Sequence, residues 1–255
     1  MRRVVLPNQY KPKTCSLERI GSKFDGGYLV PQQLISNCEE FLSLGANYDI
    51  NLEKQLNARK KMKMIIVDAS VSPLGLFKSG VKSLLLGRFW VAFRYLFAIP
   101  EQFIFRKLHK DIEFRYEFVG SLEQQSSFSG IIDSNFETNN VFVSCDIEGN
   151  EYRILDEILD VQERLCGLVI EFHDCDIHRK KIEEFIRAFA LEICHIHVNN
   201  CGLLAKDSFP TGLEITFSRY MKVSEEELQF PNLLDAPCDP KKEDLAISFE
   251  CERKV

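Results

Sequence analysis

The stretch FLSLGANYD, residues 41–49, joins a strand-like apolar run (40–44) to a glycine-containing turn. A helix-compatible segment follows at 51–60, and a second apolar run lies at 64–67. Parallel strands need crossover connections, which are usually helices. This alternation therefore predicts a Rossmann-like α/β fold with a seven-stranded, mostly parallel sheet and helices on both faces. The other strand-like runs are 114–119, 141–145, 168–172, 193–198 and 213–217.

The 255 residues are 45% hydrophobic and 27% charged, which is ordinary globular composition. We expect a single domain over residues 1–255, with an N-terminal extension (1–38) and a C-terminal extension (220–255). The net charge of −6 provides no basic field for phosphates, so nucleic acid is not expected as a partner. The nine cysteines form no CxxC pair, and residues 1–10 contain no apolar leader. These features predict reduced thiols and a cytoplasmic protein.

The segment 74–110 departs from the alternation, because it is strongly basic and rich in leucine and phenylalanine. Pro73 and Pro100 punctuate it, so we expect two amphipathic helices inserted between the second and third strands. Such helices can lie on an anionic membrane surface, contact an acidic partner, cap the domain or form a homo-oligomer interface. Glu101 is the only acid among the basic residues Lys78, Lys82, Arg88, Arg94, Arg106, Lys107 and Lys110.

The first two strands end in residues that suit a nucleoside cofactor. Gly45 follows the first strand, where a residue without a side chain lets a ligand approach the backbone. Asp68 follows the second strand, where a carboxylate can accept hydrogen bonds from ribose hydroxyls. The full GxGxxG pattern is absent, which disfavours a pyrophosphate-binding loop. The alternatives are an ordinary turn for Gly45 and a helix N-cap for Asp68.

The run 141–145 delivers two acids, Asp146 and Glu148, to the end of an apolar strand. A helix predicted from about Asn150 would place its positive end beside them. Two carboxylates at a strand end are costly unless a ligand, a metal or hydrogen bonds compensate their charge. Helix capping explains one of these acids more easily than both, so we expect a functional site here.

Histidines lie on the next two strands. His173 ends the fifth strand and should face the same crevice as Asp146. On the sixth strand, the alternation of side chains puts His195, His197 and Asn199 on one face. A strand histidine is usually a core residue with satisfied partners, which is the interpretation favoured for His195. His197 and Asn199 lie nearer the carboxyl end, and for them a functional role is favoured.

Five blocks of the sequence stand out together, namely Arg19-Ile20-Gly21 with Asp25-Gly26-Gly27-Tyr28, 145–151, 170–173, 195–200 and 213–217. In their order and spacing they resemble the FkbM-like methyltransferases, in the branch that carries an N-terminal DGGY element. The resemblance implies a class I methyltransferase fold, S-adenosylmethionine as the methyl donor, and often a sugar or other small polar acceptor in glycan or natural-product pathways. The glycine-poor motif at 43–47 and the insertion at 74–110 depart from the family pattern.

Methyl transfer to a hydroxyl requires a sulfonium held in line with an oxygen nucleophile, and a group that removes the proton. We expect His173 to be this base in preference to His197, because its chain neighbours are acidic. Asp146 is expected to take part in cofactor binding and catalysis. Ser121 and Leu122, after the third strand, lie where the adenine would be contacted. The expected acceptor-binding residues are Tyr28, Glu148 and Asn199.

Two other functions fit the same residues. Asp146, His173 and His197 are candidate ligands of a divalent cation that would assist methyl transfer. Together with His195, the same residues could instead form the site of a metal-dependent hydrolase. A noncatalytic binding module with a methyltransferase-like fold is the second alternative. Hydrolysis that requires metal would favour the first, and a folded domain that binds no adenosyl nucleotide would favour the second.

Overall fold

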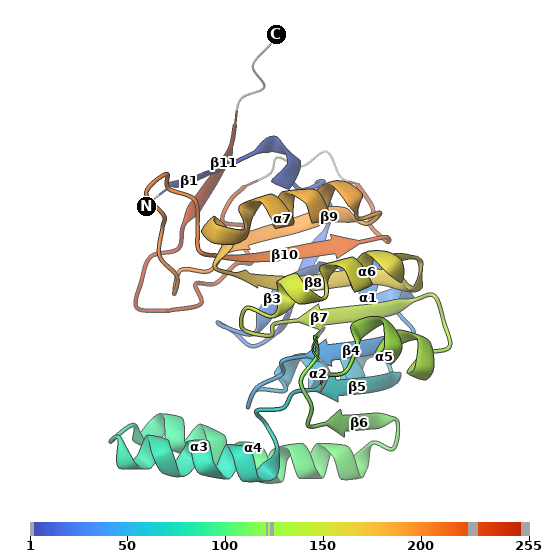
Figure 1. Cartoon of the computed structure of the whole chain (residues 1–255), viewed down its shortest axis with the longest axis vertical. Helices are drawn as coiled ribbons and strands as arrows, with labels where there is room; N and C mark the ends of the chain where they lie inside the picture. Colours follow the sequence, from blue (N-terminus) through green and yellow to red (C-terminus); the bar gives the residue numbers. More distant parts are fainter. Residues whose placement is uncertain (1–2, 121, 123–124, 224–228, 251–255) are drawn as a thin grey trace.

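The computed structural model describes residues 3–120, 122, 125–223 and 229–250. A seven-stranded sheet crosses the protein in the order β6-β5-β4-β7-β8-β10-β9 (Figure 1). The first five of these strands are mutually parallel, and β10 runs antiparallel between β8 and β9. The predicted Rossmann-like, mostly parallel sheet is confirmed. Its strands are β4 (Glu40–Leu44), β5 (Lys63–Val67), β6 (Ile112–Arg115), β7 (Val141–Cys145), β8 (Leu165–His173), β9 (Glu192–Val198) and β10 (Gly212–Ser218).

Both faces of this sheet are covered, because side chains alternate along each strand and feed two separate apolar clusters. In β4, for example, Leu42 and Leu44 belong to one cluster and Phe41 to the other. Helices α5 (Phe128–Asn135), α6 (Leu155–Asp160) and α7 (Cys175–Ala188) contribute to the first cluster. The second includes α1 (Gln32–Asn37), α2 (Asn51–Arg59) and the hairpin of β2 (Leu17–Gly21) and β3 (Gly27–Pro31).

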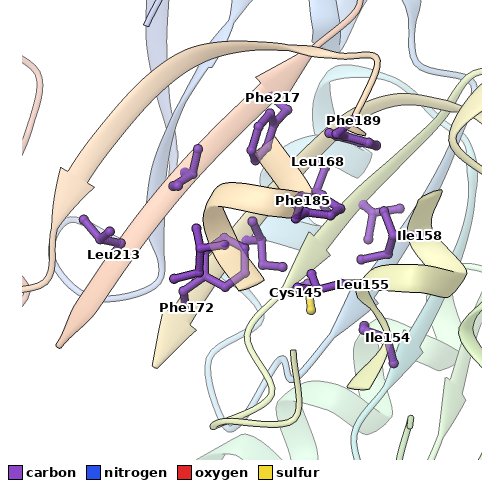
Figure 2. Close-up of a cluster of buried hydrophobic side chains, with 14 of the residues drawn as sticks. Cys145, Ile154, Leu155, Ile158, Leu168, Phe172, Phe185, Phe189, Leu213 and Phe217 are labelled. Atoms are coloured by element: carbon purple, nitrogen blue, oxygen red, sulfur yellow. The ribbon is translucent and has the colours of Figure 1, made fainter. Parts of the chain in front are cut away.

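Aromatic side chains fix α7 on the sheet (Figure 2). The ring of Phe185 lies edge-on to those of Phe172 and Phe217, with centroids 6.4 and 5.9 Å apart. Phe189, just beyond the helix, stacks on Phe185 at 4.9 Å and meets Phe217 edge-on at 5.2 Å. Such pairs stabilise a core beyond their buried area. They place the end of β8, and therefore His173, on a rigid support.

The two chain extensions meet beside the sheet. Strand β1 (Arg3–Leu6) pairs in parallel with β11 (Ala246–Phe249), and a short 3-10 turn, η1 (Asn8–Tyr10), follows β1. The C-terminal extension therefore contributes a strand, and it also supplies carboxylates to two strand histidines. Asp235 pairs with His195, which is buried with a satisfied partner as expected, and Asp244 pairs with His197. The eight cysteines among the described residues are all free, and seven of them are buried.

The predicted helical insertion between the second and third sheet strands is confirmed. It consists of α3 (Pro73–Leu85) and α4 (Phe89–Leu108), which form an antiparallel pair beside β6 (Figure 1). The side chain of Ser72 caps α3 by accepting a hydrogen bond from the backbone N–H of Gly75. Pro100 does not separate the two helices but lies inside α4. The break falls instead at Gly87, whose φ of +71° favours glycine.

No helix among the described residues is long and apolar enough to cross a membrane.

Two elements differ from expectation near the sheet edge that carries the candidate site. The third strand spans 112–115 instead of 114–119, and Val119 forms only an isolated bridge with Ser126. The helix expected from about Asn150 is replaced by the 3-10 turn η2 (Glu151–Arg153), with α6 starting at Leu155 and a second turn, η3 (Gln162–Arg164), after it. The reason lies in Glu151, whose side chain folds back onto the preceding loop.

Candidate functional site

The carboxyl ends of β4, β5 and β7 form a crevice where the strand order reverses. The chain moves outward from β4 to β5 and β6, and then returns to place β7 on the other side of β4. Open α/β sheets bind ligands at such switch points. The three strands are followed here by Gly45, Asp68 and Asp146, and each of these residues lines a cavity.

Two cavities, of about 440 and 330 Å³, meet in this crevice. The larger one lies against the β2–β3 hairpin and α2, and Tyr28 and Glu53 are among its lining residues. The smaller one lies against the end of β5 and residues 117–119, which follow β6. The cavities are adjacent, since they share three lining residues, namely Gly45, Asn47 and Asp146.

Gly45 is required by the approach of the β7 loop to the β4 turn. Its φ is +82°, and a Cβ atom there would lie 1.5 Å from the carbonyl oxygen of Asp146. The backbone N–H of Asp146 in turn donates to the carbonyl of Leu44 at 2.9 Å. Any other residue at position 45 would push the two loops apart. Gly45 thus allows the loops after β4 and β7 to lie close together. Because it has no side chain, its backbone remains accessible from both cavities.

Glu151 organises both the loop after β7 and the histidine at the end of β8. This side chain is fully buried, and its Oε1 accepts hydrogen bonds from the backbone N–H groups of Ile147 and Gly149 at 3.1 Å. The same oxygen lies 3.1 Å from Nδ1 of His173. A carboxylate at Nδ1 holds a proton there and orients the ring. The Nε2 atom of His173 is therefore the one available for chemistry.

Three further carboxyl groups surround Nε2 of His173. It lies 3.5 Å from Glu148 and 3.8 Å from both Asp146 and Glu171. Burial by itself lowers the pKa of His173, but the hydrogen bond to Glu151 and the neighbouring negative charges outweigh burial and raise the pKa to about 9. Burial raises the pKa of Asp146 to about 7, against the opposing effect of His173. Asp146 therefore changes its charge in the neutral pH range, whereas His173 stays largely protonated there.

Glu53 and Asp146 give the larger cavity buried carboxyl oxygens that lack partners. Oε1 of Glu53 accepts a hydrogen bond from the hydroxyl of Ser43 at 2.6 Å. Its Oε2, like Oδ1 of Asp146, is buried and has no hydrogen-bond partner among the described residues. Burial raises the pKa of Glu53 to about 7. Buried atoms without partners are costly, so this cavity suits a ligand that brings hydrogen-bond donors or positive charge.

Neither Glu53 nor Glu151 was predicted from the sequence as a site residue. A signal for Glu53 was present, because Leu52 and Leu56 mark the buried face of α2 and Glu53 lies on that same face. Glu151 belongs to the 145–151 block, but it was interpreted as the start of a helix. Both residues act through burial, which the spacing of residues does not reveal.

The DGGY element forms the turn between β2 and β3 and closes one side of the larger cavity. A Cβ atom on Gly27 would lie 1.8 Å from the carbonyl oxygen of Ser22, so the turn needs glycine there. Asp25 and Tyr28 flank the glycines and line the cavity. Burial raises the pKa of both side chains. The structure thus brings Tyr28 close to the strand ends, where acceptor binding was predicted.

Asp68 lies in the smaller cavity and already has local partners. One carboxylate oxygen accepts the backbone N–H of Asn47 at 2.8 Å, and the other accepts the N–H and the hydroxyl of Ser70 at 2.7 Å each. A carboxylate offers about four acceptor positions, so Asp68 can still accept from a ligand hydroxyl. The capping interpretation and the ribose interpretation are therefore compatible.

Of the two residues expected to contact the adenine, only Leu122 can be placed. Leu122 lines neither of the two cavities, and 55% of its surface is exposed. Ser121 lies outside the described residues. The position after β6 is instead occupied by Glu117, Phe118 and Val119. The shift follows from the early end of β6, which moves the chain reversal upstream.

His197 is not part of the crevice. It lies on the edge strand β9, is only 3% exposed, and is separated from β8 by β10. Its Nδ1 lies 3.0 Å from Glu214 and its Nε2 lies 3.0 Å from Asp244 of the C-terminal extension. With both ring nitrogens engaged, this placement does not favour His197 as a base. Asn199, in contrast, donates a hydrogen bond to Glu171 beside His173.

The predicted metal ligands divide between two places. Asp146 and His173 join Glu151 in a group whose possible ligand atoms all lie within 4.8 Å of one another. His197 belongs to a separate, buried group with Glu214. The prediction that Asp146, His173 and His197 could bind one divalent cation together is therefore wrong, because His197 lies in the other group. A cation held by Asp146, Glu151 and His173 stays a prediction.

No protein-family model matches the chain, and no curated protein sequence matches it. Similar solved structures include the METTL16 methyltransferase domain, which is 12% identical with a TM-score of 0.42 over 73% of this chain and 64% of that one. Precorrin-6y C5,15-methyltransferase from Geobacter metallireducens is 12% identical, with a TM-score of 0.39 over 73% of this chain and 86% of that one. WbdD is 9% identical, with a TM-score of 0.40 over 75% and 39%. This chain thus spans less than two thirds of the METTL16 domain.

Proposed function

We propose that the protein is an S-adenosylmethionine-dependent methyltransferase that methylates a hydroxyl of a sugar or another small polar acceptor. The main support is the adjacent pair of cavities at the ends of β4 and β7, where Glu53 and Asp146 present buried carboxyl oxygens without hydrogen-bond partners. A nucleoside linked to a cationic amino-acid chain matches this combination of shape and charge. The five blocks that resemble the FkbM-like family lead to the same proposal.

The cofactor would lie across both cavities. Asp68 would accept hydrogen bonds from the ribose hydroxyls in the smaller cavity, and Phe118 and Val119 would contact the adenine. Glu53 and Asp146 would bind the ammonium and sulfonium end in the larger cavity. The bound cofactor supplies a methyl group on a positively charged sulfur.

His173 would remove the proton from the acceptor hydroxyl through Nε2. With a pKa of about 9, this histidine is largely protonated in the free protein at neutral pH. A positive charge bound nearby lowers the pKa of a histidine, which favours the neutral form needed for a base. Glu151 would hold the ring in position throughout, because it stays bonded to Nδ1.

The acceptor would approach from the side of the crevice where His173 is partly exposed. Glu148 is well placed at this mouth, because its side chain is 79% exposed while its Oε2 lies 3.5 Å from His173. Asn199 and Glu171 form a hydrogen-bonded pair next to them. Carboxylates and amides that converge in this way suit the hydroxyls of a sugar.

Adenosylhomocysteine is expected to stabilise the folded protein. A ligand that binds only the native state adds about 2.7 kcal/mol at 100 times its dissociation constant. Asp68→Ala should lose most of this increment, because the ribose contact is removed. Thermal unfolding with and without ligand measures it, with each protein compared to its own ligand-free value, since Asp68→Ala also loses the bonds to Asn47 and Ser70.

The matched control is Asp133→Ala, which removes an exposed acid on α5 far from both cavities. It should keep the full increment. Equal increments in wild type and Asp68→Ala would contradict the assignment of Asp68 to the ribose. No increment in the wild type would contradict the proposed function itself.

The affinity for S-adenosylmethionine should increase with pH between about 6 and 8. The pKa of Asp146 is about 7, so its carboxyl group gains a negative charge across this range and attracts the sulfonium more strongly. We expect a gain of about fivefold, which corresponds to roughly 1 kcal/mol. Adenosylhomocysteine has an uncharged sulfur and should show a smaller gain. Calorimetric titration at several pH values measures both.

Asp146→Asn should flatten the pH dependence for S-adenosylmethionine, because the amide does not ionise in this range. Glu157→Gln is the control, since this acid lies on α6 and bonds to Ser129 outside the crevice. An unchanged pH dependence in Asp146→Asn would assign the titration to another group, with Glu53 as the next to test.

A further inference from the structure

The helical pair α3–α4 exposes an unusual number of large apolar side chains. More than half of the large apolar side chains that are exposed among the described residues lie between positions 74 and 108. The helices pack on each other through small residues, and a Cβ atom on Gly80 would lie 2.9 Å from Leu96. Only a small buried cluster of Val71, Leu76 and Ala98 forms there. The exposed residues are therefore not needed for the packing of the two helices.

The exposed apolar residues form one stripe on each helix. On α3, residues 74, 77, 81, 84 and 85 recur at helical spacing, and Leu85 is 83% exposed. On α4, residues 89, 90, 93, 97, 104 and 108 do the same, and Trp90 is 86% exposed. Continuous apolar stripes in water are unfavourable, and large exposed patches mark interaction sites. We call these two stripes the apolar face of the insertion.

Positively charged side chains lie beside the apolar face. On α3, Lys78 and Lys82 follow the stripe along one side at helical spacing, and Arg88 lies at the turn between the helices. All seven basic residues of the segment are exposed. In the part of the chain that the structure describes, no carboxylate lies within salt-bridge distance of any of them, whereas Glu101 pairs with Lys54 of α2. The segment is thus a cationic surface on a protein whose net charge is −6.

The apolar face also reaches the mouth of the candidate site. Trp90, Phe93 and Phe97 line an open cavity of about 850 Å³ against the β4–α2 loop. Tyr48 and Arg94 line both this cavity and the larger cavity of the crevice. In Figure 1, α3 and the start of α4 project beyond the sheet. A surface bound by the insertion would therefore lie next to the opening of the crevice.

We propose that α3 and α4 dock the protein on the surface of an anionic lipid bilayer. Exposed aromatic and aliphatic residues flanked by lysine and arginine are what a helix needs to lie in the interfacial region, where tryptophan is also favoured. A second copy of the chain is a poorer occupant. A symmetric dimer would bring the unpaired cations of both copies to one interface, where like charges repel. This proposal does not depend on the reaction at the crevice.

The single tryptophan of the chain provides a direct test, because Trp90 lies on the apolar face. The full-length protein is titrated with vesicles of phosphatidylcholine alone and with vesicles that also contain phosphatidylglycerol. We expect Trp90 emission to move to shorter wavelength with the anionic vesicles, and the protein to sediment with them. Added salt should weaken binding, because the attraction to the surface is screened.

Two variants separate charge from apolar contact. Lys78→Gln, Lys82→Gln and Arg88→Gln together should lower the partition coefficient about 100-fold, since each cation near an anionic surface contributes about fivefold. Arg94 is kept because it stacks on Tyr48 at the larger cavity. The control with the same change of charge is Lys180→Gln, Lys181→Gln and Lys241→Gln, at exposed positions elsewhere. It should bind vesicles like the wild type within a few fold.

Leu85→Ser with Phe89→Ser should abolish the Trp90 shift, whereas Ile177→Ser with Leu233→Ser should keep it, because the latter side chains are exposed on other surfaces. Circular dichroism verifies that each variant is folded. Failure of the wild type to bind either kind of vesicle would overturn the proposal. A Trp90 shift that appears with protein concentration alone, together with a dimer in sedimentation, would assign the apolar face to a second copy instead.

Discussion

His173→Ala is expected to lower turnover by about 100-fold or more, the usual contribution of a general base. Nε2 of His173 is the nitrogen left free, because Glu151 engages Nδ1, and it lies 3.8 Å from Asp146, which lines both cavities. Binding of adenosylhomocysteine should change little, since the cofactor contacts are assigned to other residues. The dependence on pH of kcat/KM for S-adenosylmethionine reports the protein without bound cofactor. We therefore expect kcat/KM to rise with pH up to an apparent pKa near 9, the value held by His173.

In His173→Ala this rise should disappear, which separates loss of a base from a merely structural defect. His109→Ala is the control, because this histidine packs on Phe105 at the end of α4, away from the crevice. Near-normal turnover in His173→Ala, with the rise intact, would assign proton removal to a carboxylate or to solvent. The acceptor for these assays is a panel of sugars and other small polyols with labelled S-adenosylmethionine.

His197→Ala should have the largest effect on stability, a loss of about 3–5 kcal/mol in the free energy of unfolding. Its ring lies between Glu214 and Asp244, and its removal leaves two largely buried carboxylates without their cation. Denaturant unfolding measures the loss. Turnover per folded molecule should stay near that of the wild type, since His197 lines neither cavity of the crevice.

The stability that His197 contributes should depend on pH. Burial alone lowers the pKa of His197, but the charge of Glu214 and the bonds to Asp244, Cys238 and Glu214 raise it well above the usual value. A histidine with a raised folded pKa stabilises the protein below its unfolded pKa of about 6.5, and this stabilisation is lost as pH rises through the folded value. The difference between wild type and His197→Ala should therefore shrink at high pH.

A compensated variant supplies the control. Glu214→Gln and Asp244→Asn remove the two negative charges, so adding them to His197→Ala should restore part of the lost stability. A loss below about 1 kcal/mol combined with a collapse of turnover would instead place His197 in the chemistry.

Chain order and periodicity predicted the class of the sheet. Strand-like runs alternating with helical segments favour parallel strands with crossovers, and β4, β5, β6, β7 and β8 are parallel. The apolar runs also indicated Gly45, Asp68, Asp146 and His173, because each directly follows or ends such a run, and parallel strands bring their carboxyl ends to one edge. For these four residues, the local sequence pattern was sufficient to predict their place at the strand ends.

The sequence pattern predicted less where a strand was short or where a helix had to start. Strand β6 spans only four residues, and residues 117–119, which follow it, line the smaller cavity, whereas Leu122 does not. The α-helix expected to start near Asn150 is absent there. The side chain of Glu151 instead accepts hydrogen bonds from the backbone N–H groups of Ile147 and Gly149. Side-chain hydrogen bonds of this kind compete with secondary structure and are not periodic.

The α/β fold, the strand-end residues and the basic, amphipathic nature of the insertion could be predicted from the sequence, because they follow from periodicity and composition. Which polar residues contact one another depends on the folded arrangement of the chain. In the folded protein, Glu53 and Glu151 lie at or beside the crevice and His197 lies away from it. In the sequence, however, His197 and His173 both stand near the end of a strand. The physical reason is that β10 inserts between β8 and β9, and partners such as Asp244 come from distant parts of the chain, so burial and pairing depend on contacts that local spacing does not encode.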